Sequence, residues 1–181
     1  MESRILETYP EGIYRKTEDG EMILGQALSV FIHNGDYHLV DLKVFQDGKI
    51  DCWDLIDFEE FKKKIASGWV QTSIPDGSQV SVFSLGRFKI KDSSMYIKET
   101  ELIKEVKDII DELNGKKTTS EICRGVFEEY NQSPTEENKQ KLKTAYEDIP
   151  EHNRCYVLGD MNEKDYPIRY VIYGKDVSYY Q

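Results

Sequence analysis

The sequence predicts an α+β protein, because the spacing of its apolar residues changes once along the chain. Up to about residue 97 apolar and polar residues alternate and turn dipeptides recur, whereas beyond it apolar residues recur with helical spacing. A chain of 181 residues should bury about 70% of its unfolded surface. We therefore expect a β-rich part over residues 1–97 and a helical part over residues 98–181, which fold as one cooperative unit.

The first part is expected to form a strongly curved antiparallel sheet of six or seven strands with one helix. Asn34-Gly35 and Asp47-Gly48 supply the two positive-φ residues that a type I′ turn requires, which predicts two consecutive hairpins. Apolar residues fall on both faces of these strands. Either a second layer covers the sheet or the sheet curls on itself.

The register of the first hairpin follows from its predicted turn. With a two-residue loop, Val30 lies opposite Leu39 and Ile32 lies opposite Tyr37. One face of the hairpin then carries these four side chains to the core.

Helix-starting sequences recur along the chain. Capping boxes are predicted at Asp57, Thr118 and Ser133. The first opens the one helix of the β-rich part. Between the first two boxes, an apolar stripe over Leu102–Leu113 predicts a further helix, which Asn114-Gly115 closes.

Near the C-terminus, residues 168–173 (IRYVIY) are rich in β-branched and aromatic side chains and are followed by Gly174. This composition predicts a strand. The helical part offers no strand to pair with it, so we expect a terminal strand that returns to the N-terminal sheet.

The charge and the apolar pattern exclude several classes of partner. The formal net charge is -10, and the one basic run, Lys62–Lys64, falls on a predicted helix, so nucleic acid is not expected as a partner. No stretch approaches the roughly 20 apolar residues that a membrane span requires. The N-terminus lacks the apolar segment of a secretory signal. We expect a cytoplasmic protein with no membrane partner.

The three cysteines are Cys52, Cys123 and Cys155. Their odd number and wide spacing fit neither a disulfide framework nor a pair of metal ligands. The expected state is three free thiols in a reducing compartment.

Two constellations invite a chemical interpretation. His152 and Cys155 are close in sequence, but a catalytic Cys-His pair is normally joined by the fold rather than by sequence, and Cys155 enters an apolar segment. His33, His38 and Asp36 share one face of the predicted hairpin without a further strong ligand in reach, so a polar rim is favoured over a metal site. The sequence favours a non-enzymatic protein without catalytic, metal-binding or cofactor-binding residues.

The string from Tyr156 to Gly174, YVLGDMNEKDYPIRYVIYG, is the most distinctive segment of the chain. Together with LKTAYEDIPEH before it, this string resembles a C-terminal module of a family of uncharacterised bacterial proteins. The resemblance covers about residues 135–174. It implies a bacterial or phage source and an α+β fold, and it supplies no catalytic residue.

A candidate binding site lies within the same string. Asp160, Glu163 and Asp165 place three carboxylates beside Tyr166, which would make an anionic rim around an aromatic anchor. We therefore predict an acidic protein-binding module. Its most specific form is an immunity or toxin-neutralising protein, because an acidic surface attracts a cationic partner.

Two alternatives stay open. The first is a small-molecule-binding protein or hydrolase with a pocket between the sheet and the C-terminal helices. The second is a structural subunit of a larger assembly. Buried ionisable groups converging in a pocket would favour the enzyme, whereas an acidic surface with exposed aromatic residues would favour protein binding.

Overall fold

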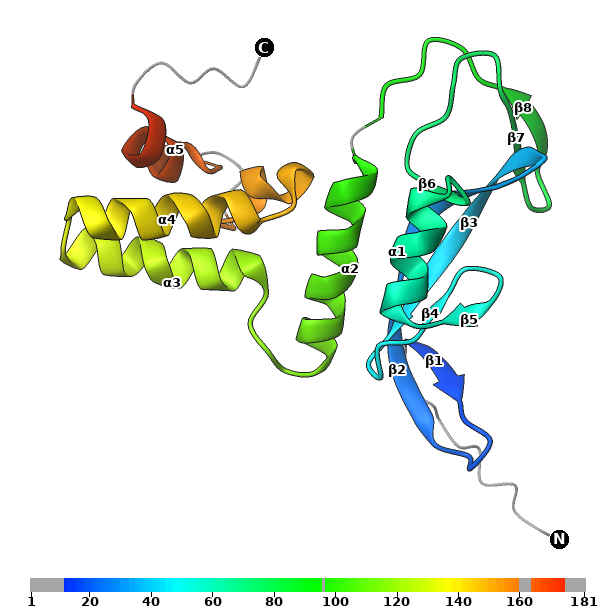
Figure 1. The fold of residues 1–181 in the computed structure, drawn as a ribbon, viewed down its shortest axis with the longest axis horizontal. Coiled ribbons are helices and arrows are strands. Elements are labelled where there is room, and N and C mark those ends of the chain that lie inside the picture. The colour runs from blue at the N-terminus through cyan, green and yellow to red at the C-terminus, as the bar shows by residue number, and fades with distance from the viewer. Residues whose placement is uncertain (1–11, 96, 160–163, 175–181) are drawn as a thin grey trace, which may run out of the picture.

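The structure is a computed structural model that describes residues 12–95, 97–159 and 164–174. A curved sheet and one helix form its N-terminal part, and four α-helices and a 3-10 helix follow (Figure 1). The strands are β1 (Ile13–Lys16), β2 (Met22–Asn34), β3 (Asp36–Phe45), β4 (Ile50–Asp51), β5 (Leu55–Ile56), β6 (Val70–Gln71), β7 (Gln79–Val82) and β8 (Gly86–Lys89). The helices are α1 (Phe58–Ala66), α2 (Glu99–Leu113), α3 (Thr119–Gln132), α4 (Glu136–Asp148), η1 (Glu151–Tyr156) and α5 (Tyr166–Tyr173).

The predicted α+β class and the curved N-terminal sheet are confirmed. The sheet has eight strands rather than six or seven, in the order β1-β2-β3-β4-β5, with β6 paired to β2, β7 paired to β3, and β8 paired to β7. β5 is only two residues long, which is too short for an alternating pattern to reveal. β7 pairs with β3 in parallel, and the other pairings are antiparallel.

The register of the first hairpin differs from the predicted one by one residue. β2 and β3 stay paired up to the residues on either side of Gly35, so a single residue with φ +78° makes the turn. Val30 lies opposite Val40, and the predicted pairing of Val30 with Leu39 is wrong. Because a one-residue shift moves a side chain to the other face of a sheet, Leu39 is exposed instead of buried.

One face of the sheet is covered by helices α1 and α2. The buried side chains of this first core come from β2, β3, β4, β6, α1 and α2 and from the residue after β4: Val30, Ile32, Leu42, Val44, Ile50, Cys52, Phe61, Val70, Leu102, Val106 and Ile109. α2 therefore packs with the residues that precede it in the chain.

A second core lies among the C-terminal helices. Its buried side chains are Cys123, Leu142, Ala145, Tyr146, Ile149, Val157, Ile168 and Ile172. Figure 1 shows α2 standing between the sheet and this group of helices. In the part of the chain that is described, no helix is both long enough and apolar enough to cross a membrane.

The predicted terminal strand is wrong, because residues 166–173 form helix α5. Pro167 occupies the first turn, where its missing amide costs nothing. Ile168 and Ile172 are spaced by four residues and are both buried in the second core, so the segment packs on α4 instead of returning to the sheet. This apolar helical spacing overrides the strand propensity of the individual residues.

The helix starts follow the predicted caps at two of three positions. The Asp57 side chain accepts a hydrogen bond from the Glu60 amide at 2.8 Å, and Thr118 opens a complete capping box. The helix expected after the third capping box is α4, and its N-cap is Thr135 rather than Ser133, because the Thr135 side chain accepts the capping hydrogen bond. The closure of α2 at Asn114 is as predicted.

The second face of α2 is polar and carries the C-terminal helices. Glu101 accepts a hydrogen bond from the Glu151 amide at 2.7 Å, and Asp108 accepts one from the Thr119 amide at 3.0 Å. Between them, Glu105 lies 2.9 Å from a ring nitrogen of His152. α2 therefore contributes apolar side chains to one core and carboxylates to the contact with the other.

Replacing Ile168 by alanine should lower the free energy of unfolding by about 2–5 kcal/mol, because the change leaves a cavity in the second core. Urea denaturation followed by circular dichroism measures this effect. Tyr170→Ala is the matched control, since Tyr170 lies on the same helix and is exposed. Equal effects of the two substitutions would contradict the packing of α5 described above.

Candidate functional site

The binding site predicted from the sequence is only partly described. Asp160 and Glu163 lie outside the described residues. Asp165 is only 1% exposed, and the Tyr146 hydroxyl donates a hydrogen bond to its carboxylate, so Asp165 does not belong to a surface rim. Tyr166, which is 49% exposed, stays a candidate contact residue.

The contact between Tyr146 and Asp165 is structural. Burial raises the pKa of the Tyr146 phenol, and the hydrogen bond to Asp165 raises it further. The phenol therefore stays neutral and donates its proton to the carboxylate. This bond ties α4 to the residue that precedes α5.

His152 and Cys155, the two residues considered for catalysis, have different side-chain partners. The His152 ring contacts Glu105 of α2, and the Cys155 thiol donates to the main-chain oxygen of His152 at 3.8 Å. The imidazole thus engages a carboxylate and not the thiol. Burial raises the pKa of the Cys123 thiol to about 11 and also raises that of Cys52.

The two histidines of the first hairpin have different neighbours. His33 stacks on Tyr37 at 4.5 Å between ring centroids, and His38 meets Trp53 at 5.1 Å. Within the described ranges, no group of three or more histidine, cysteine or acidic side chains is placed to hold a metal ion.

One edge of β3 is paired at both ends but not in the middle. Residues 43–44 pair with β4, and residues 37–39 pair with β7. Among the described residues, none forms a strand partner for residues 40–42 on this edge. A hollow of about 480 Å³ lies over the unpaired stretch, and one of about 290 Å³ adjoins it. Four residues line both hollows: Leu39, Val40, Trp53 and Phe83. We call residues 40–42 with these lining side chains the β3 gap.

Two turns hold aromatic side chains at the rim of the β3 gap. Trp53, between β4 and β5, is 47% exposed and has φ +78°. Phe83, between β7 and β8, is 92% exposed and precedes Ser84, which has φ +62°. Left-handed backbone in a bulky residue is strained and persists only where its surroundings impose it. Leu85 in the same turn is 76% exposed, so the rim is strongly apolar.

Four aspartates lie on β3, on β4 and in the turn after β4. Three of them form ion pairs within the protein: Asp36 with Arg87 at 3.7 Å, Asp51 with Lys43 at 3.4 Å and Asp54 with Lys64 at 3.6 Å. The fourth, Asp41, is exposed and lines the larger hollow. No described residue forms an ion pair or a hydrogen bond with its side chain.

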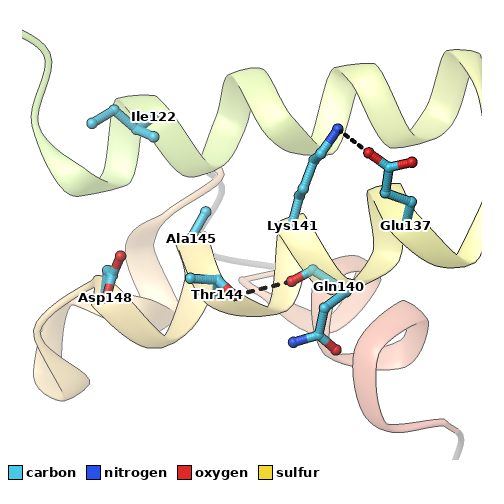
Figure 2. A pocket seen from close by; sticks show the side chains of 7 residues that line it. All are labelled: Ile122, Glu137, Gln140, Lys141, Thr144, Ala145 and Asp148. Atoms are coloured by element: carbon cyan, nitrogen blue, oxygen red, sulfur yellow. Dashed lines mark hydrogen bonds and ion pairs between the residues drawn. The ribbon is translucent and has the colours of Figure 1, made fainter.

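A second cavity lies between α3 and α4 and has a volume of about 560 Å³ (Figure 2). Ile122 of α3 faces Ala145 and Lys141 of α4 across it. Lys141 is already paired with Glu137 at 2.9 Å. The groove is wide, and its one basic group is neutralised, so it offers a ligand little beyond shallow apolar contact.

A third cavity, of about 250 Å³, lies between the sheet and the C-terminal helices. Gln26 of β2 forms one side, and Tyr156 of η1 forms another. Glu105, Asp108 and Glu112 of α2 give it an anionic wall. This cleft occupies the place at which the sequence allowed a ligand pocket.

The β3 gap was not predicted from the sequence, because it exists only where the pairing of β3 with its neighbouring strands is interrupted. A signal was nevertheless present, since Trp53 and Phe83 are large apolar residues in turns, where small polar residues and glycine predominate. Asp41 gave no signal of its own. Among the described residues, Asp41 lacks a basic partner because the nearby basic side chains form ion pairs with the other three aspartates in the folded protein.

The buried thiols should resist alkylation in the native protein. With a pKa of about 11, only about one Cys123 thiol in a thousand is ionised at about pH 8, and the thiolate is the reactive form. Mass spectrometry after brief iodoacetamide treatment should show Cys123 unlabelled in the folded protein and labelled in denaturant. Rapid labelling of Cys123 in the folded protein would contradict its burial.

Comparison with known families follows the division between the two cores. A model described as a domain of unknown function (DUF7638) matches residues 13–117, and a second, also of unknown function (DUF7639), matches residues 118–180. Their junction falls between α2 and α3. No curated protein and no solved structure matched the chain. Since the first model covers more than half of the sequence, the chain belongs to the DUF7638 family.

Proposed function

We propose that this protein is a non-catalytic protein-binding module and that the β3 gap is its binding surface. The observation that carries the proposal is the exposure of Phe83 and Trp53, which line one hollow of the sheet, and of Leu85 in the same turn as Phe83. Contiguous exposed apolar side chains mark interaction sites, and aromatic residues are typical anchors of protein interfaces.

The negative net charge of the protein supports a cationic partner. The chain has a net charge of -10, which accelerates encounter with a basic protein at moderate ionic strength. The most specific form of the proposal is an immunity or toxin-neutralising protein that acts in the bacterial cytoplasm on a basic, nuclease-like toxin. The resemblance of residues 135–174 to a bacterial family supports the bacterial setting of this form.

A second candidate function is the binding of a small cationic molecule in the cleft between β2, α2 and η1. The observation that favours it is that Glu105, Asp108 and Glu112 line the same cavity as the exposed Tyr156. In this alternative the β3 gap would have no role in function.

A photocrosslinker at position 83 should capture one defined partner. The change replaces Phe83 by p-benzoylphenylalanine, which keeps an aromatic ring in the exposed turn without disturbing the core. The matched control places the same residue at position 170, because Tyr170 is exposed on α5, away from the sheet. Irradiation in lysate of the organism that encodes the protein is read out by mass spectrometry.

The proposal expects an adduct at position 83 that is absent at position 170. Asp41→Lys in the same chain should remove the adduct while the melting temperature is unchanged, because Asp41 is exposed. Identical adducts at both positions, or an adduct at position 83 that survives Asp41→Lys, would move the assignment to another surface.

Association with the captured partner should depend strongly on salt. Between about 0.05 M and about 0.5 M salt the association rate should fall at least tenfold, whereas the dissociation rate should change much less, because long-range charge acts on encounter. Surface plasmon resonance measures both rates. A salt-independent association rate would argue against a cationic partner.

A further inference from the structure

The unpaired stretch of β3 presents main-chain polar groups as well as side chains. The amide and carbonyl of Phe45 both face the turn that leads to β4, since its amide donates to Lys49 and its carbonyl accepts from Gly48. Strand residues direct these groups alternately to one neighbour and to the other. Counting back from Phe45 in steps of two, Asp41 directs its amide and carbonyl into the β3 gap.

Asp41 is therefore the centre of a small recognition surface. Its main-chain groups can pair with one residue of an extended partner segment, as an edge strand does. Its carboxylate stands on the same residue, and no described side chain neutralises it. A partner residue paired with Asp41 would bring its own side chain close to this carboxylate.

The aromatic residues beside Asp41 suit a cation. Trp53 and Phe83 line the same hollow as Asp41, and cations are attracted to the faces of aromatic rings. The protein already uses this interaction nearby, because the Lys64 ammonium lies 4.6 Å from the centre of the Trp69 ring. Trp69 in turn meets Trp53 edge to face at 5.9 Å.

The hollow does not already contain its own free cation. Lys43 is its one basic lining residue, and the Lys43 ammonium is 3.4 Å from Asp51. The charges of Lys43 and Asp51 cancel, which leaves the hollow with the single negative charge of Asp41. An anionic group of a partner would be repelled, and a purely apolar one would desolvate the carboxylate without compensation.

We infer, on the basis of the proposed function, that the β3 gap binds a lysine or arginine side chain of the partner protein. Asp41 is the counter-ion, and Trp53 and Phe83 pack along the methylene groups of the partner's side chain and against its charged group. The aromatic rim supplies contact area, and Asp41 selects for a cation over a neutral side chain of the same length.

The inference can be tested without the partner, by titrating two small probes. Nα-acetyl-lysine methylamide carries the cation, and Nα-acetyl-norleucine methylamide has the same backbone with a neutral side chain. ¹H–¹⁵N NMR spectra report binding through the Asp41 amide and the Trp53 indole. The lysine probe should shift both signals in a saturable way, with an affinity at least about threefold higher than that of the norleucine probe.

Two variants separate the role of Asp41 from a general effect of charge. Asp41→Asn should reduce the affinity for the lysine probe to that for the norleucine probe. Asp148→Asn should leave it unchanged, because Asp148 is an exposed carboxylate of α4, and α4 lies on the other side of α2 from the sheet (Figure 1). Thermal melting checks that both variants are folded.

Equal affinities for the two probes, absence of shifts at Asp41 and Trp53, or equal effects of the two variants would overturn the inference. These outcomes are distinguishable from failure of the proposed function. If the partner still crosslinks at position 83, the protein-binding role stands and only the cation is wrong. If the lysine probe binds as expected but no partner crosslinks there, the cation site stands and the protein-binding role fails.

Discussion

Helix α2 has two different faces, and each face binds one half of the molecule. Leu102, Val106 and Ile109 complete the apolar core beneath the sheet. Glu105 and Asp108, on a neighbouring face, hold the C-terminal helices through hydrogen bonds. Apolar burial scales with area and does not depend on direction, whereas these polar contacts require particular geometry. The helix therefore anchors firmly to the sheet and positions the other helices specifically.

This arrangement leaves part of the sheet open. α1 and α2 cover one face, and the turn at Trp53 takes the chain away from β3 just after residues 43–44 have paired with β4. β7 then joins β3 only at residues 37–39. Main-chain groups that lack a strand partner must be satisfied by water or by a ligand. The same geometry that closes the core thus leaves open the stretch of β3 around Asp41 that we propose as the binding surface.

The sequence predicted features that depend on local chemistry, and it failed where distant segments decide. The α2 stripe and the cap at Thr118 follow from neighbouring residues and are present as predicted. The register at Gly35 was wrong because a turn dipeptide does not fix loop length. α5 was missed because its β-branched and aromatic residues suggest a strand, although Pro167 and the four-residue spacing of Ile168 and Ile172 fit a helix. Within the described part of the chain, Asp41 is left without an ion-pair partner because three other aspartates pair with the nearby basic residues, and the spacing of residues in the sequence does not predict such pairs.

Hydrogen–deuterium exchange at the Asp41 amide tests most directly whether the β3 gap is an unpaired strand edge that a partner completes. In the free protein this amide should exchange much faster than the amides of β2 and β3 that pair with each other, since it has no strand partner. In the complex with the crosslinked partner its exchange should slow markedly. An amide already protected in the free protein, or one whose exchange is the same in the complex, would contradict the account.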